Sequence, residues 1–305
     1  KMVSIVMATY NRAHLIEETL QSIIKQTYID WECLIIDDGS LDNTNDIIRE
    51  WTKKDSRFKY HKRTSSHKKG LPGSRNHGIE LAEGDYIIFF DDDDIVHPQN
   101  LELCVKYLES GNYDFCRYKR SVFSGDFKYN FSYDVDFYKF EITSNDVYKL
   151  LTNQLPFNSC VVMWDKVSFN GNKFNEDLMY AEEWELYSRI LMQPSIKGIS
   201  IDKTLFFGRK HSKSNTGEFY KGNRIRINSK INAIVCVINN LDKLDLLDKK
   251  FVNFFLGIRH KSESRPIYKT LVQSKSLSIK NKFYTFVRYI FLSQFKYMYA
   301  LKKNK

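Results

Sequence analysis

The sequence predicts an α/β fold with a mostly parallel sheet flanked by helices, followed by a helical C-terminal appendage. Three observations carry this prediction. Short uncharged runs typical of buried strands alternate with stretches whose apolar residues recur at helical spacing. The loops between them are short, which suits right-handed crossovers between parallel strands. A chain of 305 residues with 42% hydrophobic residues can also bury a core of the size that this fold needs.

The N-terminal third shows the alternation most clearly. Apolar residues recur at helical spacing from Leu15 to Gln26, Ile47, Ile48 and Trp51 mark a second helix, and a third contains Ile79. The predicted strands are residues 3–8, 32–36, 58–61 and 86–90. Because parallel strands end at the same edge of a sheet, the loops that follow them are expected to lie side by side.

Four aspartates, Asp91 to Asp94, directly follow the strand predicted at residues 86–90. They stand where the strand leaves the sheet, and in open α/β sheets this carboxyl edge is where ligands bind. Four adjacent carboxylates repel one another unless a cation neutralises them. Mg²⁺ or Mn²⁺ is the simplest such cation, because these ions take oxygen ligands and couple carboxylates to the phosphates of a substrate. The alternative is a solvated loop that caps the next helix.

Two further loops leave predicted strands at the same edge. They contain Thr9, Tyr10, Asn11 and Arg12 in the first loop and residues 37–40 in the second. The ring of Tyr10 can stack on a flat base, and the carboxylate of Asp37 or Asp38 can accept a hydrogen bond from a base N–H. Either loop can equally be a plain turn, since Asp, Gly and Ser favour turns. Their place beside the aspartates favours a binding site.

A basic loop, residues 62–76, follows the third predicted strand and runs into a helix. Arg75 and Asn76 fall in the first turns of this helix, whose N-terminus is expected to face the same edge. Amides and a guanidinium at that position favour an anion or a base carbonyl. The lysines of the loop are expected to be ordinary solvated residues.

Taken in order, these segments resemble the family 2 glycosyltransferases of the GT-A fold, whose sheet is Rossmann-like. The resemblance covers residues 1–105 and rests on residues 3–12, 34–40, 73–78 and 82–94, together with Pro98. It implies a nucleotide-sugar donor, usually a uridine diphosphate sugar, in the loops that contain Thr9 to Arg12 and Asp37. In this arrangement Tyr10 and Asp38 lie against the base and Arg75 lies near it.

The resemblance also implies roles for the aspartates. Asp91 to Asp93 occupy the place of the family's Asp-x-Asp motif, so that Asp93 is the best metal ligand and Asp91 or Asp92 lies at the ribose and the metal. Further along, residues 207–214 resemble the family's Arg-x-His-x-x-Ser segment, which places His211 near the metal or the diphosphate. Without this resemblance, a single His in a basic loop is more often solvated.

An acidic pair, Glu182 and Glu183, begins a predicted helix that continues to Ile190. Spacing alone indicates a surface helix, because an acidic first turn suits the helix dipole. The resemblance implies instead that the pair carries the general base. The family usually has Glu-Asp there, so Glu183 takes the base position with one extra methylene and Glu182 stays an alternative. The base would take the proton of a sugar hydroxyl that attacks the anomeric carbon, and one displacement inverts that centre.

The sequence therefore predicts a metal-dependent inverting glycosyltransferase that adds a sugar to a glycan or lipid-linked acceptor, in cell-surface polysaccharide synthesis. A sugar-phosphate nucleotidyltransferase is one alternative, but it should show a Gly-rich phosphate loop after the first strand, where this chain has residues 8–12. An inactive nucleotide-sugar-binding or membrane scaffold is another, which Asp91, Asp93 and Glu183 disfavour. No motif indicates the donor sugar, the linkage or the oligomeric state.

The predicted domains are a catalytic domain, with donor-binding and acceptor-binding halves, and a basic helical region. Their ranges are 1–217, divided into 1–105 and 106–217, and then 218–305. Residues 265–305 carry ten Lys or Arg and no Asp or Glu, which accounts for the whole net charge of +10. The neutral remainder argues against a nucleic-acid partner. Apolar residues at helical spacing between Lys282 and Lys303 predict an amphipathic helix, which either packs on the body or lies on an anionic membrane surface.

The cysteines indicate the compartment. Five of them are scattered without Cys-x-x-Cys spacing, which indicates neither a disulfide framework nor a zinc site. The first predicted strand begins at Val3, which leaves no room for a signal peptide, and no run of about 18 apolar residues is present. We therefore expect a cytoplasmic protein, located at the inner face of the cell membrane if the basic tail binds lipid.

Overall fold

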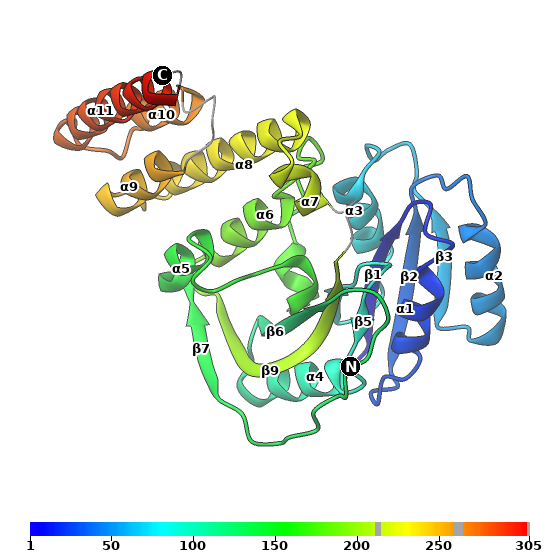
Figure 1. The fold of residues 1–305 in the computed structure, drawn as a ribbon. Helices are drawn as coiled ribbons and strands as arrows, with labels where there is room; N and C mark the ends of the chain where they lie inside the picture. Colours follow the sequence, from blue (N-terminus) through cyan, green and yellow to red (C-terminus); the bar gives the residue numbers. More distant parts are fainter. Residues whose placement is uncertain (211–214, 259–264, 304–305) are drawn as a thin grey trace. The chain divides into compact units, whose positions relative to one another are not determined.

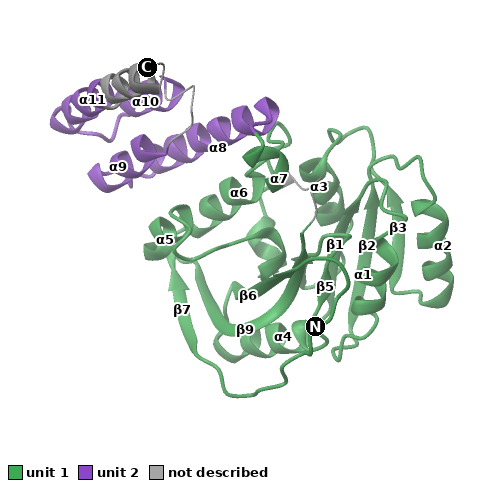
Figure 2. Ribbon diagram, viewed as in Figure 1, with its two compact units in different colours: residues 1–221 green, residues 222–305 purple. Residues whose placement is uncertain are grey.

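The computed structural model describes residues 1–210, 215–258 and 265–303. The chain divides into two units, residues 1–221 and residues 222–305, each with its own internal packing (Figure 2). The sheet and the predicted site residues belong to the first unit, and of these residues His211 lies outside the described ranges. The second unit is helical.

The N-terminal half of the sheet is parallel. β1 (Val3–Thr9) lies between β2 (Trp31–Asp37) and β4 (Tyr86–Phe89), and β3 (Phe58–Lys62) lies beyond β2 (Figure 1). All three of these pairings are parallel. β1 and β2 are buried along almost their whole length, which explains why both read as unbroken apolar runs.

The other half of the sheet is mixed. β8 (Val162–Asp165) runs antiparallel to β4 and to β6 (Phe115–Phe123), while β6 runs parallel to β9 (Lys197–Arg209). β7 (Lys139–Thr143) and the short β5 (Ile95–Val96) both pair antiparallel with β9. The predicted α/β fold is thus confirmed, with β4 at the junction between a parallel and a mixed half.

Helix α3 (Leu71–Leu81) packs on β1 and β2. Gly78 permits this close approach, because a Cβ there would come within 2.3 Å of Cγ1 of Val6. The approach fixes the N-terminal part of α3, including Arg75, beside the carboxyl ends of the parallel strands. The other helices of the unit are α1 (Ile16–Ile23), α2 (Thr44–Lys54), α4 (Asn100–Gly111), α5 (Val147–Leu151), α6 (Glu182–Leu191) and α7 (Asn215–Tyr220).

Unit 2 confirms the predicted helical C-terminal region. α10 (Arg265–Gln273) packs on α8 (Arg224–Lys243) and α9 (Lys249–Gly257), and α11 (Ile279–Lys303) packs on α9 and α10. Among the described residues, no helix is both long enough and apolar enough to cross a membrane.

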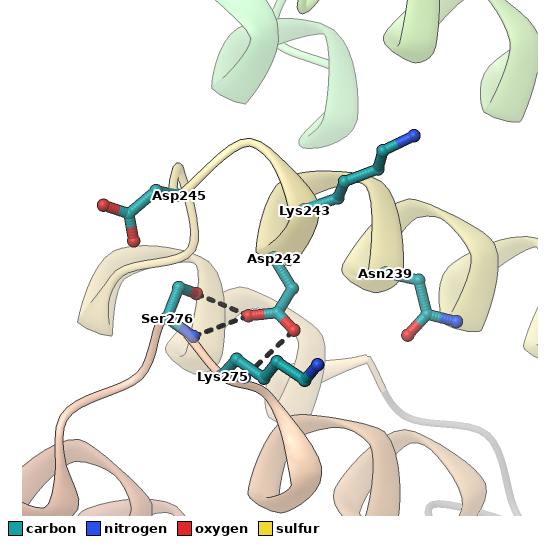
Figure 3. A pocket seen from close by; sticks show the side chains of 6 residues that line it. All are labelled: Asn239, Asp242, Lys243, Asp245, Lys275 and Ser276. Carbon is teal, nitrogen blue, oxygen red and sulfur yellow. Dashed lines mark hydrogen bonds between the residues drawn. The ribbon is translucent and has the colours of Figure 1, made fainter.

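Asp242, near the end of α8, anchors the connection between α10 and α11 (Figure 3). Its Oδ1 accepts hydrogen bonds from the backbone N–H and the hydroxyl of Ser276, at 2.8 and 2.6 Å, and from the hydroxyl of Ser274, at 2.6 Å. Its Oδ2 accepts from the N–H of Lys275 at 3.0 Å. Burial opposes ionisation, but these bonds outweigh it and hold the pKa of Asp242 well below its usual range. A cavity of about 530 Å³ opens beside this anchor and contains none of the predicted site residues.

Candidate functional site

The loops after β1 and β2 are bonded to each other at the carboxyl edge of the sheet. Asn11 has a positive φ of 53°, which Asn adopts more readily than most residues. In this conformation its N–H donates to the hydroxyl of Ser40 at 2.9 Å, and its side-chain oxygen accepts from the N–H of Leu41 at 2.8 Å. The N–H of Asp38 also donates to the carbonyl of Thr9 at 2.9 Å. The two loops therefore form one surface.

Tyr10 and Asp38 meet the basic loop before α3. Tyr10 is 41% exposed, and Nζ of Lys69 lies 4.7 Å from the centre of its ring. The carboxylate of Asp38 accepts from the N–H of Gly70 at 3.0 Å and from Nε of Arg63. The two residues predicted to contact a base are thus held by neighbouring positions of one loop.

Asp37 bonds within the protein. Its Oδ1 accepts from the backbone N–H groups of Gly39 and Ser40, at 3.2 and 2.8 Å. Its Oδ2 accepts from the hydroxyl of Tyr60 at 2.8 Å, and burial together with this bond raises the pKa of Tyr60 to about 12. Asp37 therefore shapes the loop from which Asp38 projects.

Three of the four clustered aspartates are buried, so the alternative of a solvated loop is wrong. Nε of Arg12 lies 3.2 Å from Oδ1 of Asp92, and its Nη2 lies 3.9 Å from Oδ2 of Asp93. Burial raises the pKa of Asp92 to about 7, with Arg12 opposing this shift and the charge of Asp93 adding to it. Asp94 accepts a hydrogen bond from the N–H of Arg209 at 2.6 Å, while burial and the neighbouring aspartates raise its pKa well above the usual range.

One group of possible ligands comes within coordinating distance, and it shares Asp91 with the predicted set of Asp91, Asp93 and His211. Among the described residues, Asp91, Asp94 and Cys160 each offer a ligand atom, and these atoms lie within 4.8 Å of one another. Two carboxylates suit a hard divalent cation, whereas burial raises the pKa of the Cys160 thiol and keeps it protonated. Asp94 belongs to the aspartate run but had no predicted metal role, and no sequence pattern indicated Cys160. Asp93 instead lies beside Arg12.

Arg75 joins the aspartates to the acidic pair. Its side chain is 3% exposed, and its Nη2 donates to Oδ1 of Asp91 and to the hydroxyl of Ser159, both at 3.0 Å. Its Nη1 lies 3.5 Å from Oε1 of Glu182. The resemblance implies a place for Arg75 near the base. In the structure its guanidinium lies between the carboxyl groups of Asp91 and Glu182, and the Asp91 carboxylate supplies the anionic partner that a buried cation needs.

The acidic pair lies at the N-terminus of α6. Ala181, directly before it, adopts a left-handed conformation with φ 66° and ψ 23°, which costs about 1–2 kcal/mol in a residue with a Cβ. Glu182 is 4% exposed, whereas Glu183 is half-buried. Burial and the adjacent charge of Glu183 raise the pKa of Glu182 to about 8, although Arg75 opposes the shift. At neutral pH Glu182 therefore retains its proton.

A second buried contact, centred on His67, joins the two halves of the site. Nδ1 of His67 lies 2.7 Å from Oε1 of Glu176, and Nε2 lies 3.0 Å from Oε2 of Glu80. Glu176 also accepts from Nδ2 of Asn76 at 2.8 Å and from the N–H of Lys68 at 2.6 Å. Burial lowers the pKa of His67, but the two carboxylates outweigh it and raise that pKa above its ordinary value. Sequence reasoning missed this contact.

Comparisons with known proteins show the family of this chain. A family model described as glycosyl transferase family 2 matches residues 4–170. An uncharacterized glycosyltransferase of Rickettsia felis is 32% identical over 215 residues, which are 70% of this chain and 34% of that protein. The chain thus spans about a third of the length of this relative.

Two further comparisons extend the match. An Escherichia coli protein named UDP-Glc:alpha-D-GlcNAc-diphosphoundecaprenol beta-1,3-glucosyltransferase WfgD is 30% identical over 199 residues, which are 65% of this chain and 73% of that protein. Among solved structures, Staphylococcus aureus TarS 1–349 in complex with UDP-GlcNAc gives a TM-score of 0.65 at 18% identity, over 95% of this chain and 88% of that one. This structural likeness shows a shared fold.

Proposed function

We propose that this chain, which belongs to glycosyl transferase family 2, transfers a sugar from a nucleoside diphosphate sugar to a hydroxyl of a lipid-linked glycan. The observation that carries the proposal is the buried bridge of Arg75 between Asp91 and Glu182. It joins the aspartate cluster and the acidic pair in one site. Glycosyl transfer needs both parts, because charge must be controlled at the leaving diphosphate and a base must act at the acceptor hydroxyl.

For the donor we propose a uridine diphosphate sugar in the loop that contains Thr9 to Arg12. The exposed ring of Tyr10 suits a stacked base, and the carboxylate of Asp38 suits a base N–H. Asp37 would act indirectly, by holding the shape of this loop. The Escherichia coli relative is named as a glucosyltransferase that uses UDP-Glc, which supports the choice of uridine diphosphate.

The carboxylates suit Mg²⁺ or Mn²⁺, with Asp91 and Asp94 as ligands and Asp93 as a further candidate. When bound, such an ion would neutralise the negative charge that develops on the leaving diphosphate. Arg12 supplies the chain's own positive charge at Asp92 and Asp93. His211 remains a candidate ligand from the sequence alone.

Glu183 is the proposed general base. It is half-buried and so can reach an acceptor, whereas Glu182 is buried, paired with Arg75 and protonated at neutral pH. As the hydroxyl oxygen bonds to the anomeric carbon, Glu183 takes the hydroxyl proton and the nucleoside diphosphate leaves with the electrons of its bond. This single displacement inverts the anomeric centre. Glu182 would position Arg75 against Asp91.

The acceptor is proposed to be a lipid-linked glycan that binds residues 106–217. The name of the Escherichia coli relative gives a diphosphoundecaprenol-linked acceptor, which supports this class and a role in polysaccharide synthesis. The acidic pair begins α6, which belongs to the same part of the chain as the strands β6 to β9 of the mixed half, so an acceptor hydroxyl would approach from this half.

Titration calorimetry with uridine diphosphate, with and without Mn²⁺, tests the donor site. We expect binding that requires Mn²⁺, is lost in Asp91→Ala and Asp94→Ala, and is unchanged in Asp126→Ala, an exposed aspartate in the loop after β6. Asp93→Ala shows whether this carboxylate is a further ligand. Equal binding without the metal would contradict the metal site, and no binding in either condition would contradict a uridine nucleotide.

Turnover of a uridine diphosphate sugar tests the base. We expect Glu183→Gln to lower turnover by about 10²- to 10⁴-fold while uridine diphosphate still binds. Glu182→Gln keeps a proton on that side chain and should lower turnover much less at neutral pH. An equal or larger loss in Glu182→Gln would show that the base has been assigned to the wrong residue.

A further inference from the structure

Helix α11 turns polar side chains toward its own unit. Thr285 is fully buried, and its hydroxyl donates to the carbonyl of Asn281 at 2.7 Å. The hydroxyl of Tyr284 donates to Oδ1 of Asn253 on α9 at 2.7 Å. Nη1 of Arg288 donates to the same Asn253 oxygen and, at 2.9 Å, to the hydroxyl of Tyr284. Two hydrogen bonds to Asn253 therefore join α11 to α9.

The opposite side of α11 is apolar and exposed. Ile279, Phe283 and Phe286 are 87%, 67% and 46% exposed, and steps of four and three residues place them in one stripe along the helix. Phe291, 60% exposed, lies about a third of a turn away. A surface helix ordinarily buries its apolar face and exposes its polar one. In α11 the stripe of Ile279, Phe283 and Phe286 faces water instead, and exposed apolar side chains gathered in one place are typical of an interaction site.

The charges around this stripe select its partner. Lys280 and Lys282 lie on its two sides by helical geometry, and residues 265–305 contain ten Lys or Arg and no Asp or Glu. A second copy of the chain would bring like charges together, which is unfavourable. An anionic bilayer surface instead offers apolar chains for the stripe and negative head groups for the lysines.

We propose that α11 lies in the plane of an anionic lipid bilayer, with Ile279, Phe283 and Phe286 inserted among the acyl chains and Lys280 and Lys282 at the head groups. The described residues contain no helix able to span a membrane, so the contact is at one face of the bilayer. The proposal is independent of the donor and acceptor, because it rests on the surface of α11 alone.

Flotation of the full chain with lipid vesicles tests the proposal. Vesicles of phosphatidylcholine with about one third phosphatidylglycerol should carry the protein upward, whereas pure phosphatidylcholine vesicles should not. The double variant Ile279→Ser/Phe283→Ser should lower the partition at least about tenfold. The matched control is Ile29→Ser/Val167→Ser, which removes two apolar side chains of similar exposure, 77% and 69%, from unit 1 and should change nothing.

Two further measurements keep the test decisive. Lys280→Ala and Lys282→Ala should each lower the partition coefficient of the protein between vesicles and water about fivefold. A charge near the membrane surface contributes about 1 kcal/mol to the free energy of binding. Circular dichroism confirms that each variant is folded, and light scattering gives its oligomeric state. Absence of wild-type binding to anionic vesicles, or equal losses in the α11 pair and the control pair, would overturn the proposal. So would a dimer that the α11 pair disrupts, because the stripe would then be a contact between copies.

Discussion

Replacing Arg75 by Met tests the buried bridge directly. The variant keeps a side chain of similar length between Phe89 and Phe174, whose ring centres lie 5.6 and 5.5 Å from the guanidinium. It removes the hydrogen bonds to Asp91 and Ser159 and leaves Glu182 buried without its cation. The packing is largely retained, so the electrostatic contribution should dominate the result.

Removing one partner of a buried ion pair costs about 3–5 kcal/mol. Two features indicate that Arg75→Met should lower the free energy of unfolding by about 3 kcal/mol at pH 7, at the low end of this range. Asp91 is 41% exposed, so water can replace part of the lost interaction, and Glu182, with a pKa of about 8, is mostly neutral at this pH. Above that pKa Glu182 ionises in the wild type with Arg75 beside it, whereas the variant offers it no cation. The difference in the free energy of unfolding should therefore be larger at pH 9 than at pH 7.

Urea denaturation at pH 7 and pH 9 measures both values. The control is Lys53→Met, since the side chain of Lys53 is 71% exposed and pairs with Glu50 at the surface, where such a pair contributes little to stability. A cost for Arg75→Met no larger than that of Lys53→Met would refute a stabilising bridge. A cost that does not change between the two pH values would refute the role assigned to Glu182.

Two further predictions concern the contacts that hold the site's loops. His67→Gln should lower the free energy of unfolding by about 1–3 kcal/mol near pH 6, because an imidazolium can donate to Glu176 and Glu80 at once. Because the pKa of His67 is raised in the folded state, this stabilisation is complete below the pKa of the unfolded state and is lost as the pH rises through the pKa of the folded state. The free energies of unfolding of wild type and variant, measured with urea, should therefore converge toward pH 9. An equal difference at pH 6 and pH 9 would argue against a charged His67. Gly78→Ala should destabilise by about 1–3 kcal/mol because its methyl group would meet Val6 at 2.3 Å, and thermal unfolding should show partial rescue by Val6→Ala. Gly257→Ala, whose added methyl meets nothing within 4 Å, is its control and should lose no stability.

The parallel half of the sheet could be predicted from the sequence because its strands are short, apolar and separated by periodic helices. This places Tyr10, Asp38 and Asp91 at one edge without any structure. The mixed half was not assigned strand by strand, since partners such as Ile95 and Phe207 lie far apart in the chain and form only a short ladder.

The contacts within the site were harder to predict than its location. The acidic pair at Glu182 was identified from the sequence. Its link to Asp91 through Arg75 depends on how α3 packs against the sheet. Contacts between residues so far apart in the chain produce no periodic pattern in the sequence, so this link could not be predicted. Cys160 was missed as well, because a buried thiol in a short 3₁₀ helix has the same sequence signal as any core residue. His211 lies outside the described residues, so its predicted role was not tested.

The short strand β5 has a consequence for how this protein is assembled. β5 comes early in the chain, but its only partner among the described strands, β9, comes at residues 197–209. During synthesis the parallel half of the sheet emerges first. The partners of two of its site residues are made later, because Asp94 bonds to the N–H of Arg209 and Arg75 contacts Glu182. A fragment that ended at residue 170, where the family match ends, would contain the aspartates without either partner. The segment by which the family is recognised is therefore shorter than the segment that must fold before the site is complete.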